Sequence, residues 1–155
     1  MPTYTVFAQT GRLSQAQKSG VAAEITRVHN EQTGAQTFFA QVIFQDVPDG
    51  NHFVGGAPLA GDHIFVHGQI RAGRDAATKR VLLERMLDAV CAAASAQKIN
   101  TWVYIVDLPP SQMAEYGHVL PEPGAEAAWL AALPAADRER MQTTGKPGQA
   151  DAGRH

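Results

Sequence analysis

A strand–helix–strand pattern occurs twice along this chain, and the duplication restricts the possible folds more than any other feature. Residues 103–109 repeat residues 42–48, with Asp107 standing 61 positions after Asp46. A repeat of this length in only two copies indicates a duplicated structural unit, because two copies cannot stack into a solenoid. The sequence therefore predicts repeat one over about residues 2–48 and repeat two over about residues 63–109.

The first repeat carries a signal for each of its elements. Residues 3–9 alternate polar and apolar side chains, which predicts a strand. Ser14 and Gln17 have the spacing of a capping box, so a helix is expected to begin there and to end at Gly34, which suits a left-handed cap. A second strand is expected over residues 38–46. A helix between two strands of one sheet implies parallel pairing through a right-handed crossover.

The second repeat predicts the same elements. Residues 63–70 are the expected third strand, Asp75 is the expected N-cap of the second helix, and residues 101–107 are the expected fourth strand. Two such units side by side predict an α/β (α+β) fold with a four-stranded mixed sheet and both helices on one face. The expected inner face of the second helix consists of Val81, Leu82, Met86, Leu87, Val90 and Cys91.

One face of this sheet has no predicted helix to cover it. The strands are apolar on both sides, whereas a sheet with one solvated face alternates more strictly. Association with further copies of the chain is the simplest cover for such a surface. The remaining expectations are one domain over residues 1–142, an irregular arm over 110–142 with short helices at 126–133 and 135–142, and a disordered tail over 143–155.

The composition excludes several classes of function. The 155 residues, 45% apolar and 18% charged, are typical of one globular domain. A formal net charge of −2 gives no attraction to nucleic acid or to an anionic membrane. The single cysteine, Cys91, excludes an internal disulfide and a cysteine zinc cluster. No signal peptide precedes the first strand and no apolar run approaches the ~20 residues of a membrane span, so we expect a cytoplasmic protein.

Pro2 is the first candidate for chemistry because it follows the initiator methionine. A small residue in this place favours removal of Met1, which would leave Pro2 as a free secondary amine. An α-amine titrates near pH ~8, so burial or a neighbouring charge can make it an acid or a base near neutrality. Met-Pro also begins many chains in which the proline has no chemical role, and the residues alone leave both interpretations open.

Arg71 and Arg74 lie where the third strand gives way to the second helix. A helix N-terminus offers free N–H groups and the positive end of the helix dipole, so this loop could bind a carboxylate or a phosphate. The alternative is that both arginines are solvated loop residues.

Three further residues could serve such a site, although each has an ordinary structural interpretation. His29 lies on the apolar stripe of the first helix, where a histidine is usually a satisfied core residue. Tyr104 lies in the middle of the fourth strand, and its hydroxyl would need a partner if it were buried. Glu115 lies in the irregular arm, where a glutamate is usually solvated surface.

Taken together, these residues resemble the tautomerase superfamily, and most closely its cis-3-chloroacrylic acid dehalogenase group. Residues 61–68, 70–74 and 115–117 carry the resemblance, which runs from Pro2 to about Met141. The resemblance implies a tautomerase (MIF-like) fold that assembles as a homotrimer and uses no metal and no cofactor. It implies Pro2, Glu115, Tyr104 and His29 as catalytic residues, and Arg71, Arg74 and His29 as the residues that bind a small carboxylate substrate.

The reaction that the resemblance implies is addition of water to a small α,β-unsaturated carboxylate, either a 3-halo or an acetylenic acid, by a hydrolytic dehalogenase or hydratase. Glu115 and Tyr104 would activate the water, cationic Pro2 would protonate C2, and the product would be of the malonate semialdehyde type. The group's pattern has threonine in place of Ala35 and leucine in place of Phe39, which leaves the substrate open. The alternatives are a keto–enol (phenylpyruvate-type) tautomerase, an isomerase with Pro2 as base, and a non-catalytic trimeric binding module.

Overall fold

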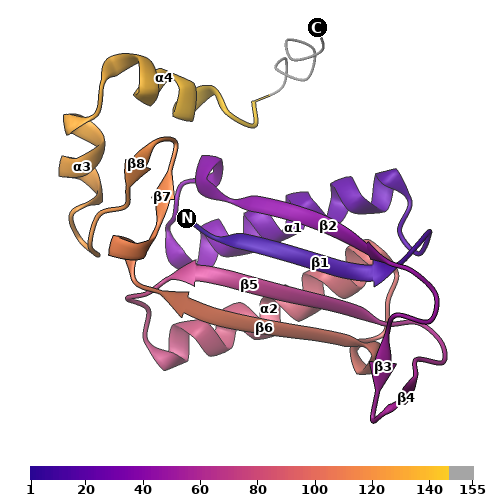
Figure 1. Ribbon diagram of the computed structural model, residues 1–155. Helices are drawn as coiled ribbons and strands as arrows, with labels where there is room; N and C mark the ends of the chain where they lie inside the picture. The colour runs from indigo at the N-terminus through magenta and orange to yellow at the C-terminus, as the bar shows by residue number, and fades with distance from the viewer. Residues whose placement is uncertain (147–155) are drawn as a thin grey trace, which may run out of the picture.

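The computed structural model describes residues 1–146, and its centre is a four-stranded sheet in the order β2-β1-β5-β6 (Figure 1). Within each repeat the strands pair in parallel, β1 (Thr3–Gln9) with β2 (Gln41–Val47) and β5 (Ile64–Arg71) with β6 (Thr101–Leu108). The repeats meet in the middle of the sheet, where β1 pairs antiparallel with β5. The mixed four-stranded sheet predicted from the duplication is thereby confirmed.

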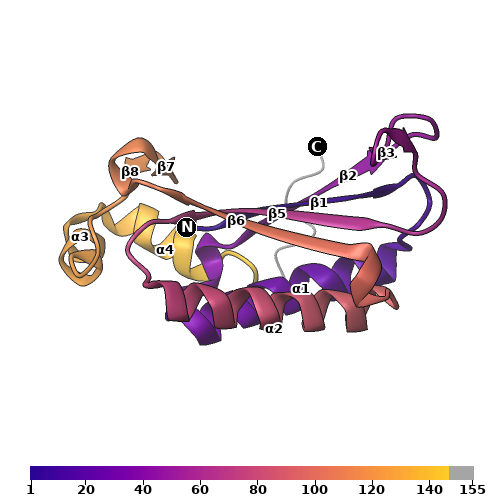
Figure 2. The same cartoon turned by 90° about the horizontal axis from the view of Figure 1, so that it is seen from below.

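Two long helices lie side by side on one face of the sheet (Figure 2). They are α1 (Gln15–Thr33) and α2 (Ala76–Ala94). Ser14 forms the predicted capping box, Gly34 ends α1 in the left-handed conformation at φ 72°, and the side chain of Asp75 caps α2. The local signals therefore fixed both helix starts correctly.

The core lies between the helices and the inner face of the sheet. At an offset of 61 residues, the buried positions of α1 coincide with buried positions of α2. The prediction that Val81 belongs to the inner face is wrong, because this side chain is 40% exposed and lies beside the buried stripe. Cys91 is buried as expected. The four pairs of buried positions that coincide between α1 and α2 are Val21 with Leu82, Ile25 with Met86, Val28 with Ala89, and His29 with Val90.

The second strand begins later than the sequence predicted. Residues 37–39 form a short 3-10 turn, η1 (Thr37–Phe39), and the strand starts only at Gln41. The reason is that the Phe39 side chain is buried in a small separate cluster with Met1 and Leu120 instead of extending along the sheet. The apolar pair Phe38 and Phe39 therefore marks this second cluster.

The remaining elements form a hairpin at one end of the sheet and an arm at the other (Figure 1). The sequence predicted the two arm helices but neither hairpin, and the arm hairpin turns at Tyr116 and Gly117, whose φ angles are 53° and 84°. The described chain continues past the last helix to residue 146, and residues 147–155 of the predicted tail lie outside the described residues. The hairpin consists of β3 (Phe53–Val54) and β4 (Ala57–Pro58), and a short turn, η2 (Lys98–Asn100), precedes β6. The arm consists of η3 (Pro110–Gln112), β7 (Ala114–Glu115), β8 (His118–Val119), α3 (Glu126–Ala132) and α4 (Ala135–Thr143).

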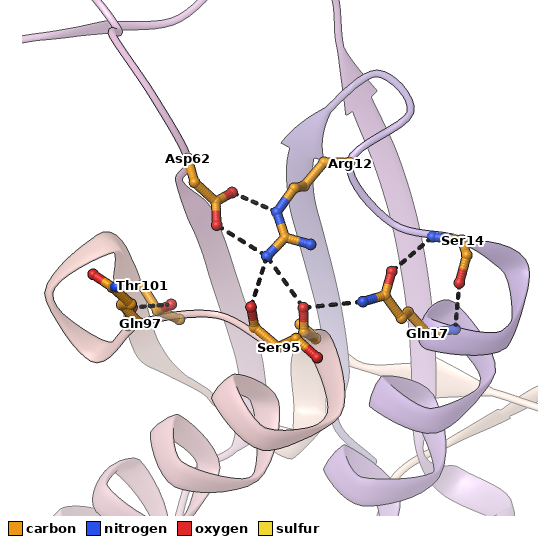
Figure 3. Close-up of polar contacts among 8 residues, drawn as sticks. Arg12, Ser14, Gln17, Asp62, Ser95, Gln97 and Thr101 are labelled. Atoms are coloured by element: carbon orange, nitrogen blue, oxygen red, sulfur yellow. Dashed lines mark hydrogen bonds and ion pairs between the residues drawn. The ribbon is translucent and has the colours of Figure 1, made fainter.

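An arginine clamp fastens the two repeats at the end of the sheet away from the arm (Figure 3). Arg12 Nε donates to Asp62 Oδ1 at 2.5 Å, and Arg12 Nη2 donates to Asp62 Oδ2 at 2.9 Å. The same Nη2 atom donates to the carbonyls of Ala94 at 3.1 Å and Ser95 at 3.3 Å. The clamp thus binds carbonyl groups that the C-terminus of α2 leaves free.

The opposite face of the sheet is bare within residues 1–146 (Figure 2). Large apolar side chains stand on it, among them Ile43 at 45%, Trp102 at 43% and Tyr104 at 52% exposure. Such a surface is typical of an interface, because isolated proteins rarely expose a continuous apolar patch of this kind. No helix within the described residues is long and apolar enough to cross a bilayer.

Candidate active site

The antiparallel pairing of β1 with β5 places the chain's N-terminus beside the predicted arginine loop. Thr3 lies opposite Gln69 in the register, so the residues before Thr3 lie next to Arg71 at the end of β5. The arm returns to the same end of the sheet and brings Glu115 and α3 there (Figure 1). Strand topology therefore assembles a site from segments that are far apart in the sequence.

The N-terminal amine lies inside this site. In this structure the amine belongs to Met1, which donates a hydrogen bond to the Phe39 carbonyl at 2.8 Å and lies 3.3 Å from Glu115 Oε2. Burial lowers the pKa of the amine from 8.0 to about 5, with the Arg71 and Arg74 charges acting in the same direction and Glu115 opposing them. Pro2 is buried directly behind it and accepts a hydrogen bond from the Gln41 N–H at 3.0 Å.

Arg71 is almost completely buried, with 5% of its surface exposed. Its Nη1 donates to the Pro121 carbonyl at 3.0 Å, and its Nη2 pairs with the carboxylate of Glu126. Its Nε is the one buried side-chain nitrogen or oxygen within residues 1–146 that has no hydrogen-bond partner. A buried donor without a partner is costly, so a further acceptor that bound to this guanidinium would be stabilising.

Arg74 is half-buried and stands next to Arg71 in the loop before α2. Its Nη1 donates to the Arg71 carbonyl at 2.8 Å, which orients the side chain. Burial and the neighbouring Arg71 charge both lower the pKa of Arg74 from its ordinary value. Two guanidinium groups held this close favour an anion between them, because an anion relieves their mutual repulsion.

His29 is also part of this region, and its surroundings keep it neutral. The ring is 2% exposed, and its Nδ1 atom lies 2.8 Å from the hydroxyl of Tyr4. Burial, helped by the charges of Arg74 and the N-terminal amine, lowers the pKa of His29 to about 3. A neutral imidazole can position a substrate by hydrogen bonding, but it cannot supply a positive charge at neutral pH.

Two hollows lie near the N-terminal amine. The smaller, of about 330 Å³, is lined by Met1, Ala35, Arg71 and Arg74, together with α3 residues such as Trp129. The larger, of about 640 Å³, opens toward the bare face of the sheet, and the residues that line it include Thr3, Phe39, Gln41, Glu115 and Tyr116. The arginines and the carboxylate of Glu115 therefore line different hollows.

Tyr104 lies apart from the other predicted site residues within this chain. It stands on the bare face of β6, where its ring packs edge-on against Phe65 with centroids 5.0 Å apart. In the register it lies beside His67 of β5, in the middle of the sheet and away from the end that carries Arg71. A role for Tyr104 in this site would therefore require a different copy of the chain.

Comparison with known proteins identifies the family to which the chain belongs. A family profile described as "Putative oxalocrotonate tautomerase enzyme" matches residues 1–132. A solved structure of N1, a member of the cis-3-chloroacrylic acid dehalogenase family, has 34% sequence identity and a TM-score of 0.87. The alignment covers 90% of this chain and 98% of that chain. The chain belongs to the tautomerase superfamily.

More distant members of the superfamily share the fold alone. A fused 4-OT, solved as an asymmetric trimer, has 21% identity and a TM-score of 0.69, covering 76% of this chain and 94% of that chain. A comparison with curated protein sequences found no significant match. The tautomerase superfamily consists of enzymes, and this chain carries the fold with its candidate site at the N-terminus of β1.

The structure adds residues to this candidate site that the sequence did not predict. They are Tyr4, which bonds His29, Glu126, which pairs with Arg71, and Phe39, whose carbonyl accepts the N-terminal amine. Glu126 and the carbonyl of Phe39 have no local signal, because only the folded arm and turn bring them to the site. Tyr4 could have been noticed as a large polar residue on the inward-facing side of the first strand.

Proposed function

We propose that this tautomerase superfamily member is a hydratase or hydrolytic dehalogenase that adds water to a small α,β-unsaturated carboxylate, a 3-halo or an acetylenic acid. The observation that carries the proposal is the arrangement around the N-terminal amine. Arg71 and Arg74 line one side of it, and Glu115 lies 3.3 Å from it while lining the other hollow. A tautomerase that uses its amine only as a base does not need this carboxylate.

Removal of Met1 is the maturation step on which the mechanism depends. It would expose the secondary amine of Pro2 and vacate the space that the buried Met1 side chain fills against Phe39 and Leu120. The two hollows would then meet at the new amine. Substrate on the arginine side and water on the Glu115 side would approach the amine from opposite directions.

The proposed reaction follows from these positions. Arg71 and Arg74 bind the substrate carboxylate and draw electron density from the double bond, which makes C3 electrophilic. Glu115 accepts a proton from water as the water oxygen bonds to C3, and the cationic amine of Pro2 gives its proton to C2. With a 3-haloacrylate, the resulting halohydrin loses hydrogen halide and becomes malonate semialdehyde. His29 would hold the carboxylate end.

Tyr104 can join this chemistry only from a second copy of the chain. Its position on the bare face of the sheet is the place where another copy would pack, and the larger hollow beside Glu115 opens toward that face. We propose a homotrimer in which the Tyr104 of one copy helps Glu115 of a neighbouring copy to orient water.

The experiment is a screen of small unsaturated acids followed by proton NMR, using protein whose mass shows that Met1 is absent. We expect cis-3-haloacrylates and acetylenic acids to yield hydration products. Glu115→Gln should abolish hydration because an amide cannot accept the proton of water. Thr101→Val, which removes a buried hydroxyl outside the site, is the matched control and should retain the activity. Hydration that survives Glu115→Gln would overturn the proposal.

Keto–enol tautomerisation of a phenylpyruvate-type acid is the second candidate, and one observation favours it. The buried amine has its pKa lowered to about 5, which favours the neutral form that acts as a base. Since Glu115 raises that pKa, Glu115→Gln should lower it further and move the acidic limb of the tautomerase rate–pH profile to lower pH. Tautomerisation that is lost in Glu115→Gln while hydration persists would make this second candidate the main activity.

A further inference from the structure

Tyr4 and His29 form a polar pair inside an otherwise apolar core. Both side chains are almost completely buried, at 0% and 2% exposure, and the Tyr4 hydroxyl lies 2.8 Å from His29 Nδ1. Tyr4 faces Gly68 across the β1–β5 pairing. A Cβ atom at position 68 would come within 2.5 Å of the Tyr4 ring, so the glycine makes the room that the tyrosine occupies.

The second repeat fills the matching places with valines. Val66 stands 62 positions after Tyr4, and Val90 stands 61 positions after His29, which are the offsets of the strands and of the helices. Val6 likewise takes the place of Gly68, 62 positions earlier. All three valines are buried. The fold therefore packs well without a polar pair at this place, so its presence in repeat one calls for a role besides packing.

The hydrogen bond between the two rings has a preferred direction. Burial raises the pKa of Tyr4, so its hydroxyl keeps its proton. If the hydroxyl accepted a hydrogen bond from Nδ1–H, its own hydrogen would need another acceptor. Within residues 1–146 the hydroxyl has no partner besides His29. A buried donor left without a partner costs more than an acceptor left half-used. The hydroxyl therefore donates to Nδ1, and the ring proton lies on Nε2.

His29 lies near the arginine side of the site, because the charges of Arg74 and of the N-terminal amine both lower its pKa. Nε2 has no hydrogen-bond partner within the described residues, and this atom is not completely sealed from solvent although the residue is only 2% exposed. An N–H group in this position can donate to an anion held by the arginines.

We propose that Tyr4 is a positioning residue that fixes His29 as the Nε2–H tautomer, so that the ring presents a neutral N–H donor to the carboxylate in the arginine hollow. The identity of that carboxylate rests on the proposed function, whereas the tautomer does not. Gly68 makes this arrangement of Tyr4 and His29 possible, because the Tyr4 ring fits only where no Cβ is present. The donor is held in one orientation before the ligand arrives, which spares the ligand the cost of ordering the ring.

The test reads the tautomer directly. Long-range ¹H–¹⁵N spectra of the histidine rings are recorded on ¹⁵N-labelled protein that lacks Met1, and His29 is assigned from the signals missing in His29→Gln. We expect an unprotonated Nδ1 and a protonated Nε2, with Nε2 shifting on titration with malonate, a non-reacting carboxylate. In Tyr4→Phe the two tautomers should mix, and the dissociation constant for malonate should rise about two- to tenfold.

Thr101→Val is the control, because it removes a buried hydroxyl that donates to the Gln97 carbonyl at 3.0 Å. It should leave both the His29 spectrum and malonate binding unchanged. A protonated Nδ1 in the wild-type protein would overturn the proposal, even if Tyr4→Phe does not fold. An unchanged His29 spectrum in folded Tyr4→Phe would also overturn it. Turnover does not enter either readout, so a failed hydration assay would be a separate result.

Discussion

Arg71 and Arg74 share one loop and one charge, yet their surroundings prepare them for different tasks. Arg71 is buried and fastened to the arm through the Pro121 carbonyl and the Glu126 carboxylate. Arg74 is half-buried and has only the Arg71 carbonyl as its partner within residues 1–146. Arg71 therefore links the arm to the sheet as well as lining the hollow, whereas Arg74 keeps most of its donors available to a ligand.

Gly68 allows a prediction at the scale of single residues. Gly68→Ala would place a Cβ 2.5 Å from Tyr4 Cε1 and 2.8 Å from Tyr4 Cδ1, and a fully buried ring has no room to withdraw. We expect a loss of about 1–3 kcal/mol in the free energy of unfolding, measured with urea.

Gly20→Ala is the matched control for that substitution. Gly20 lies inside α1, and its added Cβ would meet only the Ala93 Cβ at 3.9 Å. Because alanine is a better helix former than glycine, this variant should be as stable as the wild type or more stable. Equal stability of the two alanine variants would contradict the close packing of Tyr4 on Gly68.

At the scale of elements, the two repeats keep the same supports but differ at their ends. Lys18 pairs with Asp46 at 3.3 Å, and Lys79 pairs with Asp107 at 2.7 Å, so each repeat ties its helix to its second strand in the same way. The arginine that follows the first strand of each repeat has diverged in role. Arg12 forms the clamp with Asp62, whereas Arg74, its counterpart 62 positions later, lines the smaller hollow of the candidate site.

The Arg12 clamp gives a prediction about how the elements are held together. Arg12→Ala removes a bidentate ion pair with Asp62 and two hydrogen bonds to the end of α2, so we expect a loss of about 1–3 kcal/mol in the free energy of unfolding. Arg80→Ala is the control, because Arg80 is 81% exposed and pairs only with Glu84 on the same helix. Such an exposed pair contributes less than about 1 kcal/mol. A clamp variant as stable as the control would show that the clamp contributes nothing measurable.

The sequence predicted the elements better than it predicted their contacts. The capping box at Ser14 and the left-handed Gly34 are local signals, so the helix ends followed from the residues nearby. Phe39 was assigned to a strand because an apolar side chain does not reveal which of two clusters it joins. The pairing of Arg71 with Glu126 joins residues 55 positions apart through the arm, and no local pattern encodes such a contact.

At the scale of the whole molecule, the bare sheet face is the feature that remains to be covered. Its exposed large apolar side chains come from the two outer strands, β2 and β6. The described chain has no element left to lie on this face (Figure 2). The arm folds around one end of the sheet instead. A neighbouring copy of the chain is the occupant that we propose for this face, because association would remove its apolar side chains from water.

The proposed homotrimer should have a mass of about 50 kDa, three times the 16.6 kDa of one chain, measured by sedimentation. Ile43→Lys places a charge on the bare face and should dissociate the assembly, because a buried charge without a partner is costly. Val81→Lys is the matched control, since Val81 is similarly exposed but lies on α2, away from that face. A wild-type protein that sediments as a single 16.6 kDa species would contradict the prediction.

The antiparallel junction between β1 and β5 limits how many reactive amines the duplicated chain can offer. Ile64 is the counterpart of Pro2, 62 positions later, and it lies inside a continuous backbone where its nitrogen is an amide. An amide cannot be a basic secondary amine, so the far end of the sheet holds the Asp62–Arg12 clamp in place of a second site. Because both repeats lie in one polypeptide, an alkylating analogue directed at the N-terminal amine should label each chain once, although each chain contains the strand–helix–strand unit twice.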